Sequence, residues 1–264
     1  MSLSLVDSHC HLDRLDLAKL GADLDGVLAS ARQHGVTHML CVCIDMDNFP
    51  AVVALAERYP QVFASVGVHP NEQDTRDPNV RELLELAQPA KVIAIGETGL
   101  DYFHGKGDLD WQRERFRRHI RAARESGKPL IVHSRNAKED TLRIMREEQA
   151  EEIGGVMHCF TEDWDMAQQA MELNFFISFS GIVTFRNADQ LREVARRMPL
   201  ERMLVETDAP YLTPLPYRGK SNQPAYVRYV AEHIAGVRDE PLETIAQATT
   251  QNFFTLFQSA AMII

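Results

Sequence analysis

The chain has 264 residues, of which 45% are hydrophobic and 25% charged, and its formal net charge is −10 at pH 7. This composition and the absence of a Pro/Gly/Ser-rich linker predict one folded domain over residues 1–264. The negative charge excludes tight binding of duplex DNA through a broad basic face, but it allows a local positive field in a cleft. The sequence shows no leader-like start and no run of about 18 apolar residues, so we expect a cytoplasmic protein that does not enter the membrane.

Short apolar runs alternate with amphipathic stretches in chain order. We expect strands at residues 5–11, 37–45, 62–69, 92–97, 129–134, 154–160, 175–182 and 203–208. Each run is followed by a helical pattern, as at 48–59, 80–88, 111–126, 137–149, 164–173 and 188–197, with two more helices near 224–236 and 241–257. This alternation implies parallel strands and predicts an α/β fold of the (β/α)8 TIM-barrel type. An open doubly wound sheet is the rival fold, but no G-x-G-x-x-G follows the first strand.

Polar side chains gather at the carboxyl ends of these runs. His9 and His11 end the first run and, by strand alternation, should share a face with Asp7. The later runs end, in chain order, with Asp45, His69, Glu97, His133, His158, Glu206 and Asp208. Since the carboxyl ends of barrel strands meet at one mouth, we expect these residues to be neighbours. The other histidines are expected at ordinary surface positions, namely His34, His38, His104, His119 and His233.

Imidazoles and carboxylates without thiolates are typical ligands of a catalytic divalent ion. Four histidines and two carboxylates exceed what one ion needs, so we predict two divalent ions per chain, which could be Zn, Mn or Mg. Glu97 lies between the His9/His11 side and the His133/His158 side in barrel order, so it is the expected bridging ligand.

Seven short motifs, in order along nearly the whole chain, resemble the TatD family of metal-dependent deoxyribonucleases. They are D-S-H-C-H-L-D at 7–13, G-V-H-P at 67–70, G-E-T-G-L-D-Y at 96–102, H-S-R at 133–135, H-C-F at 158–160, E-T-D-A-P-Y-L at 206–212 and P-Y-R-G-K at 216–220. The resemblance implies that His9, His11, Glu97 and Asp208 hold one ion, and that Glu97, His133 and His158 hold the other. Many relatives in the wider amidohydrolase-type superfamily have a carboxylated lysine where Glu97 stands here, which favours the TatD branch. Ser221 and Gln223 depart from the R-N-E-P that commonly follows R-G-K in the family, and this departure bears on substrate preference.

The resemblance further implies a 3′–5′ exonuclease that cleaves single-stranded DNA, here expected to act as a monomer. Metal-activated water would attack phosphorus with Asp208 as the general base, and His69 would contact the substrate or leaving group outside the metal ligands. Arg135 and Arg218 are suited to bidentate contacts with phosphate.

Two other functions remain open from the sequence. A hydrolase of a small amide, lactone or phosphoester could use the same ions, and a metal-buffering or scaffold protein would not catalyse at all. Arg135, Arg218 and Lys220 favour a phosphodiester substrate. The Arg-rich stretch from Arg113 to Arg124 is expected to be a solvated helix face rather than a nucleic-acid site.

Overall fold

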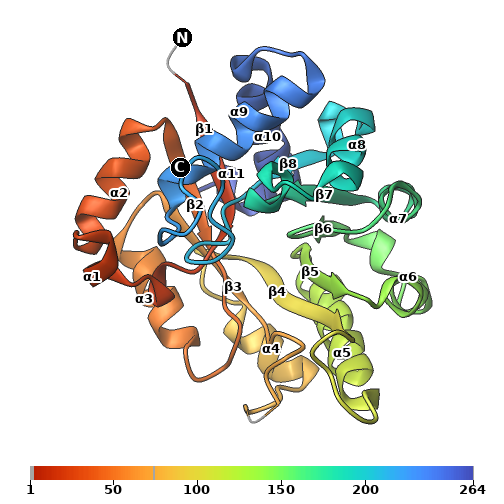
Figure 1. Ribbon diagram of the computed structural model, residues 1–264. Coiled ribbons are helices and arrows are strands. Elements are labelled where there is room, and N and C mark those ends of the chain that lie inside the picture. Colours follow the sequence, from red (N-terminus) through yellow and green to blue (C-terminus); the bar gives the residue numbers. More distant parts are fainter. Residues whose placement is uncertain (1–2, 74, 264) are drawn as a thin grey trace.

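The computed structural model describes residues 3–73 and 75–263. Eight parallel strands follow one another in a single sheet in chain order, and the sheet curls into a nearly closed barrel (Figure 1). The strands are β1 Leu5–Cys10, β2 Val36–Cys41, β3 Val62–Val66, β4 Val92–Asp101, β5 Leu130–Arg135, β6 Gly155–Met157, β7 Phe175–Phe179 and β8 Met203–Val205. The predicted (β/α)8 barrel is confirmed.

Helices surround the barrel; those up to Arg197 connect successive strands, and those from Val227 onward follow the last strand (Figure 1). They are α1 Leu17–Leu20, α2 Leu24–Gln33, α3 Phe49–Arg58, α4 Val80–Leu86, α5 Asp110–Ser126, α6 Lys138–Glu147, α7 Trp164–Glu172, α8 Asp189–Arg197, α9 Val227–Arg238, α10 Leu242–Leu256 and α11 Gln258–Ala261. In the part of the chain that the structure describes, none of these helices has the length and apolarity needed to cross a bilayer.

The barrel closes between β1 and the residues that follow β8. The backbone N–H of Asp208 donates to the carbonyl of His9 at 2.9 Å, and that of His11 donates to Ala209 at 2.8 Å. These bonds place Asp208 beside two histidines that lie about 200 residues earlier in the chain.

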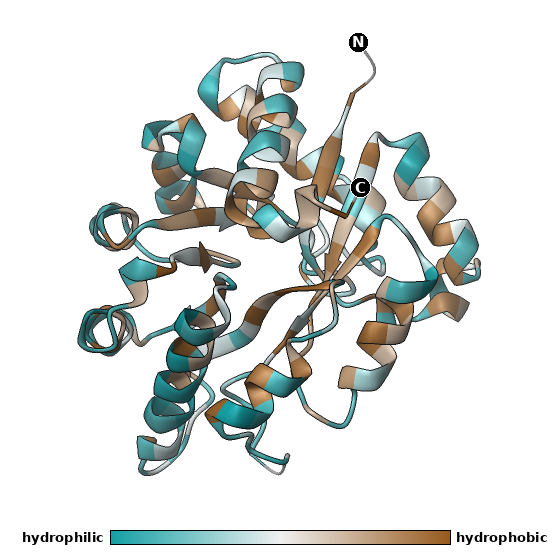
Figure 2. Cartoon of the chain, turned by 180° about the vertical axis from the view of Figure 1, so that it is seen from behind, coloured by the Kyte–Doolittle hydropathy of each residue, from teal (hydrophilic) through white to brown (hydrophobic). Residues whose placement is uncertain are grey.

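The barrel interior is apolar below the mouth. One buried cluster takes a residue from each of the eight strands, and Phe253 and Phe257 join it from α10 and its carboxyl end. These two aromatic side chains therefore fill the end of the barrel opposite the carboxyl ends of the strands. The central strands are largely hydrophobic, while the surrounding helices carry hydrophilic residues on their outer surfaces (Figure 2).

The strand boundaries differ from the prediction mainly at the mouth. Most strands end earlier than expected, so His69, His158 and Asp208 lie in the loops that follow β3, β6 and β8. The apolar runs had suggested longer strands because buried residues such as Val42 and Val68 continue beyond the last ladder pairs. By contrast, β4 continues through Glu97 to Asp101. At Gly99 the two strands β4 and β5 approach so closely that a Cβ would collide with the carbonyl oxygen of His133.

Candidate metal centre

The carboxyl ends of the strands surround a pocket of about 730 Å³. Seven of the residues that the sequence predicts as metal ligands, substrate contacts or catalytic groups line this pocket: His11, His69, Glu97, His133, Arg135, His158 and Asp208. His9 lies fully buried behind them. The convergence expected from the barrel geometry is therefore present for the six predicted metal ligands and for His69.

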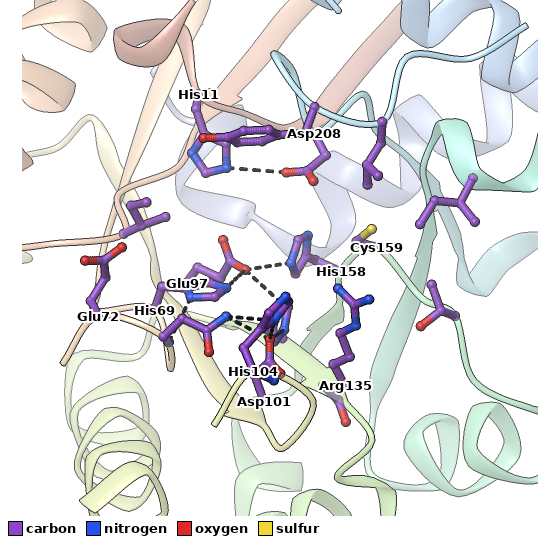
Figure 3. Close-up of a pocket in the computed structure, with 18 residues that line it drawn as sticks. His11, His69, Glu72, Glu97, Asp101, His104, Arg135, His158, Cys159 and Asp208 are labelled. Carbon is purple, nitrogen blue, oxygen red and sulfur yellow. Dashed lines mark hydrogen bonds and ion pairs between the residues drawn. The ribbon is translucent and has the colours of Figure 1, made fainter. Parts of the chain in front are cut away.

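Glu97 lies at the centre of this set (Figure 3). Its Oε1 is 2.7 Å from His158 Nε2, 3.2 Å from His133 Nδ1 and 3.3 Å from His69 Nε2. Its Oε2 faces the other side, 3.3 Å from His9 Nε2. The two oxygens of the Glu97 carboxylate thus lie next to two different groups of imidazoles. A ligand that bridges two ions requires this arrangement.

The second group lies on the other side of Glu97 and includes Asp208. Asp208 Oδ1 is 3.3 Å from His11 Nε2 and 3.7 Å from His9 Nε2, and these two ring nitrogens are 3.3 Å apart. Asp208 adopts a left-handed backbone (φ 56°), which aspartate tolerates better than most residues.

Burial and the neighbouring imidazoles together determine whether Glu97 and Asp208 are ionised. Burial by itself would raise the pKa of Glu97, but the imidazoles of His158, His69 and His9 outweigh it and hold the pKa well below its ordinary value. Burial likewise opposes ionisation of Asp208, yet His11 and His9 lower the pKa of Asp208. Both carboxylates are therefore ionised at neutral pH and can bind a cation.

The ring nitrogens also fit a cation. The ligand atoms of His9, His11 and Asp208 all lie within 4.8 Å of one another, and so do those of His69, Glu97 and His133. Within the described residues, His158 Nε2, the ring nitrogen that faces Glu97, is buried without a hydrogen-bond partner of good geometry. Buried polar atoms normally have partners, and nitrogen atoms that converge on a carboxylate without one are suited to a divalent ion.

Two buried carboxylates lie behind the imidazoles and orient them. Asp101 Oδ2 is 3.4 Å from His133 Nε2 and 2.8 Å from His104 Nδ1, and Glu206 Oε1 is 3.2 Å from His158 Nδ1. Carboxylates in this position fix the orientation of metal-binding imidazoles. The sequence analysis did not single out Asp101, although its position four residues after Glu97 on the same strand would have placed it on the same face.

His69 lies closer to the imidazole cluster than the sequence suggested. The prediction placed it outside the metal ligands, whereas its Nε2 is as near to Glu97 as that of His9, and its ring centroid is 4.5 Å from that of His133. The geometry therefore allows His69 to be a metal ligand as well as a substrate contact.

Helix α5 holds the segment that carries His69. The Arg115 guanidinium donates to the carbonyls of His69 (3.0 Å) and Glu72 (2.7 Å). The Val68 N–H donates to His119 Nε2 at 3.1 Å. His119 is fully buried, so its predicted surface position was wrong, and Arg115 likewise belongs to the interior rather than to a solvated face.

Two further expectations from the sequence are corrected. Asp7 does not join the histidines, because β1 shifts register between Asp7 and Cys10 and the Asp7 carboxylate accepts from the N–H and hydroxyl of Thr207 instead. Asp45 pairs with Arg14 at 2.6 Å rather than pointing into the site. Arg218 does not line the pocket, and its guanidinium lies over the ring of Phe185 at 3.8 Å. Its contact with substrate stays a prediction.

A (β/α)8 barrel with imidazoles and carboxylates at the carboxyl ends of its strands is the architecture of one class of metal-dependent hydrolases. Residues 6–258 match the model of the TatD related DNase family, and the chain belongs to this family.

The chain is 51% identical over 254 residues to the uncharacterized metal-dependent hydrolase YcfH of Escherichia coli K12, covering 96% of this chain and 95% of that protein. It is 41% identical to the uncharacterized metal-dependent hydrolase YabD of Bacillus subtilis over 255 residues, with 96% and 99% covered. The crystal structure of the TatD homologue YjjV of Escherichia coli K12 superposes with a TM-score of 0.88 at 30% identity, covering 98% of this chain and 99% of that one. The protein is thus a metal-dependent hydrolase of the TatD family.

Proposed function

We propose that this hydrolase cleaves phosphodiester bonds of single-stranded DNA as a 3′–5′ exonuclease. The observation that carries the proposal is the position of Arg135, which lines the same pocket as the Glu97-centred cluster. A cationic donor beside the metal ligands suits a phosphodiester, which is negatively charged before it reacts, better than it suits a neutral amide or lactone. The family match to TatD related DNases supports the same substrate.

The residues divide into two ligand sets that share Glu97. We infer that His9, His11, Asp208 and Glu97 hold one divalent ion, and that Glu97, His133 and His158 hold a second, with His69 within reach of the latter. Two ions bound there would supply a nucleophile at neutral pH and stabilise negative charge on the phosphoryl oxygens. Zn, Mn and Mg all remain candidates, because the ligands are nitrogen and oxygen atoms only.

Side chains around the ions would supply the general base and the donors to the phosphoryl oxygens. Asp208 stays ionised and faces the pocket, so it can accept the proton of the attacking water. Arg135 can donate charge-assisted hydrogen bonds to the phosphoryl oxygens, and these bonds strengthen as negative charge develops. Glu206 and Asp101 keep the imidazoles of His158 and His133 in place.

The test uses single-stranded oligonucleotides labelled at the 5′ or the 3′ end, with the metal removed by chelation and then restored. Mononucleotides released from the 3′ end only after metal is restored would support the proposal. Elemental analysis of the active protein should find two ions per chain. Metal-dependent turnover of a neutral ester without cleavage of DNA would instead support the small-molecule alternative, and activity with at most one bound ion would exclude the two-ion arrangement.

A further inference from the structure

Two exposed aromatic rings lie at the pocket: Tyr211 lines it, and Phe103 lies beside it in contact with the lining residue Arg135. Phe103 is 56% exposed and follows β4, while Tyr211 is 50% exposed and follows β8. Since the strands run in order around the barrel, β4 and β8 lie across the mouth from one another. In Figure 3 Asp101 and His104, which neighbour Phe103 in sequence, lie on one side of Glu97, and His11 and Asp208 lie on the other.

The backbone of both residues is hydrogen-bonded, and each ring has a neighbour at the pocket. The N–H of Phe103 donates to Asp101 Oδ1 at 2.9 Å, and the Arg135 guanidinium lies 4.1 Å from the centre of the Phe103 ring. The N–H of Tyr211 donates to the carbonyl of Asp208 at 2.9 Å. The Tyr211 ring meets His11 edge to face at 6.1 Å. Each exposed ring therefore lies next to a residue that lines the pocket, Arg135 for Phe103 and His11 for Tyr211.

Exposed aromatic rings in these places suit a ligand with flat apolar groups. A chain with a net charge of −10 gains little from long-range attraction to a polyanion, so binding must come from contacts at the pocket. Unpaired nucleobases stack on aromatic side chains and on Arg guanidinium planes, and such stacking does not depend on sequence. In duplex DNA the bases already stack on one another and offer no free face.

We propose that Phe103 with Arg135, and Tyr211 on the opposite side, form two stacking platforms for unpaired bases on either side of the phosphate that lies over Glu97. This inference rests on the proposed function and deepens it, because it assigns the preference for single strands to two named rings. It accounts for how an acidic protein can retain a nucleic-acid strand at its pocket.

The test compares a single-stranded oligothymidylate with a strand of the same length whose bases near the cleaved end are replaced by abasic sugars. Both strands keep their phosphates, so the ratio of their kcat/KM values isolates the contribution of the bases. Phe103→Ala and Tyr211→Ala should each reduce this ratio by roughly 5- to 150-fold, the range expected for the loss of one stacked base. Tyr211→Phe retains the ring and should retain the ratio. Leu215→Ala is the matched control, since Leu215 is also 50% exposed after β8 but has no aromatic face.

Several results would overturn the inference, and they separate it from the proposed nuclease activity. If Phe103 only holds Arg135 in place, Phe103→Ala will slow both strands equally and its stacking role is excluded. If the alanine variants cleave both strands with the wild-type ratio, the platforms are wrong while the nuclease stands. A second experiment measures binding without cleavage: fluorescence anisotropy follows the binding of the labelled oligothymidylate to protein whose metal has been removed by a chelator. Binding that depends on Phe103 and Tyr211 in a protein that cleaves no DNA would support the platforms and refute the nuclease, whereas no binding and no cleavage would refute both.

Discussion

Protonation of His119 should destabilise the fold in mild acid. This imidazole is fully buried in α5, its Nδ1–H donates to the carbonyl of Arg115 at 2.8 Å, and its Nε2 accepts from the N–H of Val68 at 3.1 Å. Burial lowers the pKa of His119 from 6.5 to about 4. Only the neutral ring can accept from Val68, so a proton on Nε2 would oppose an N–H with another N–H.

The change in folding stability with pH follows from the difference between the pKa of His119 in the unfolded chain and its pKa in the folded protein. In the unfolded chain His119 gains a proton as the pH falls through about 6.5, whereas in the folded protein it stays neutral down to about 4. Stability is therefore fully present above pH 6.5 and is lost progressively between pH 6.5 and pH 4, by about 3 kcal/mol in total. This loss is a large fraction of the stability of an ordinary domain.

The measurement is urea unfolding of wild type and His119→Gln at about pH 7.5 and about pH 5.5, both in chelator so that metal binding does not contribute. Glutamine does not titrate, and its amide oxygen can still accept from Val68. The free energy of unfolding of the variant should fall less on acidification than that of wild type, by roughly 1 kcal/mol over this interval. His34→Gln is the matched control, because His34 donates the same bond to the carbonyl of Ser30 at 2.8 Å but is only half-buried. A pH dependence of His119→Gln that equals the wild-type dependence would refute the reasoning.

Other predictions concern catalysis and metal binding. Asp208→Asn should lower kcat by roughly 10²- to 10⁴-fold while much of the metal remains, and near wild-type turnover would show that another group is the base. Asp101→Asn should weaken metal binding by about 10- to 100-fold, because the amide no longer holds His133 as firmly; a competition titration that finds unchanged affinity would contradict this role. Arg135→Ala should cost on the order of 2–4 kcal/mol in kcat/KM on DNA but little on a neutral ester. Arg218→Ala should cost clearly less on DNA, since Arg218 lies over Phe185 outside the pocket lining, and equal losses for the two arginines would contradict this difference.

The sequence by itself determined the barrel and most of the candidate site. Apolar runs that alternate with amphipathic helices leave few arrangements other than a parallel barrel, and in a barrel the carboxyl ends of the strands must meet. His11, Glu97, His133 and Asp208 could therefore be predicted as neighbours before any contact was known. The predicted strand ends were less accurate, because hydrophobicity reports burial and not which backbone groups pair.

Only the tertiary structure decided how each polar side chain is used. A register shift in β1 turns Asp7 toward Thr207, and no local pattern in the sequence signals that shift. His119 contacts Val68 across 51 residues, so its helix gives no sign of burial against the loop that carries His69. Arg135 and Arg218 look equivalent in sequence, yet one lines the pocket and the other covers Phe185. Periodicity fixes which face a side chain occupies, whereas its partner depends on contacts between segments that are distant in the chain.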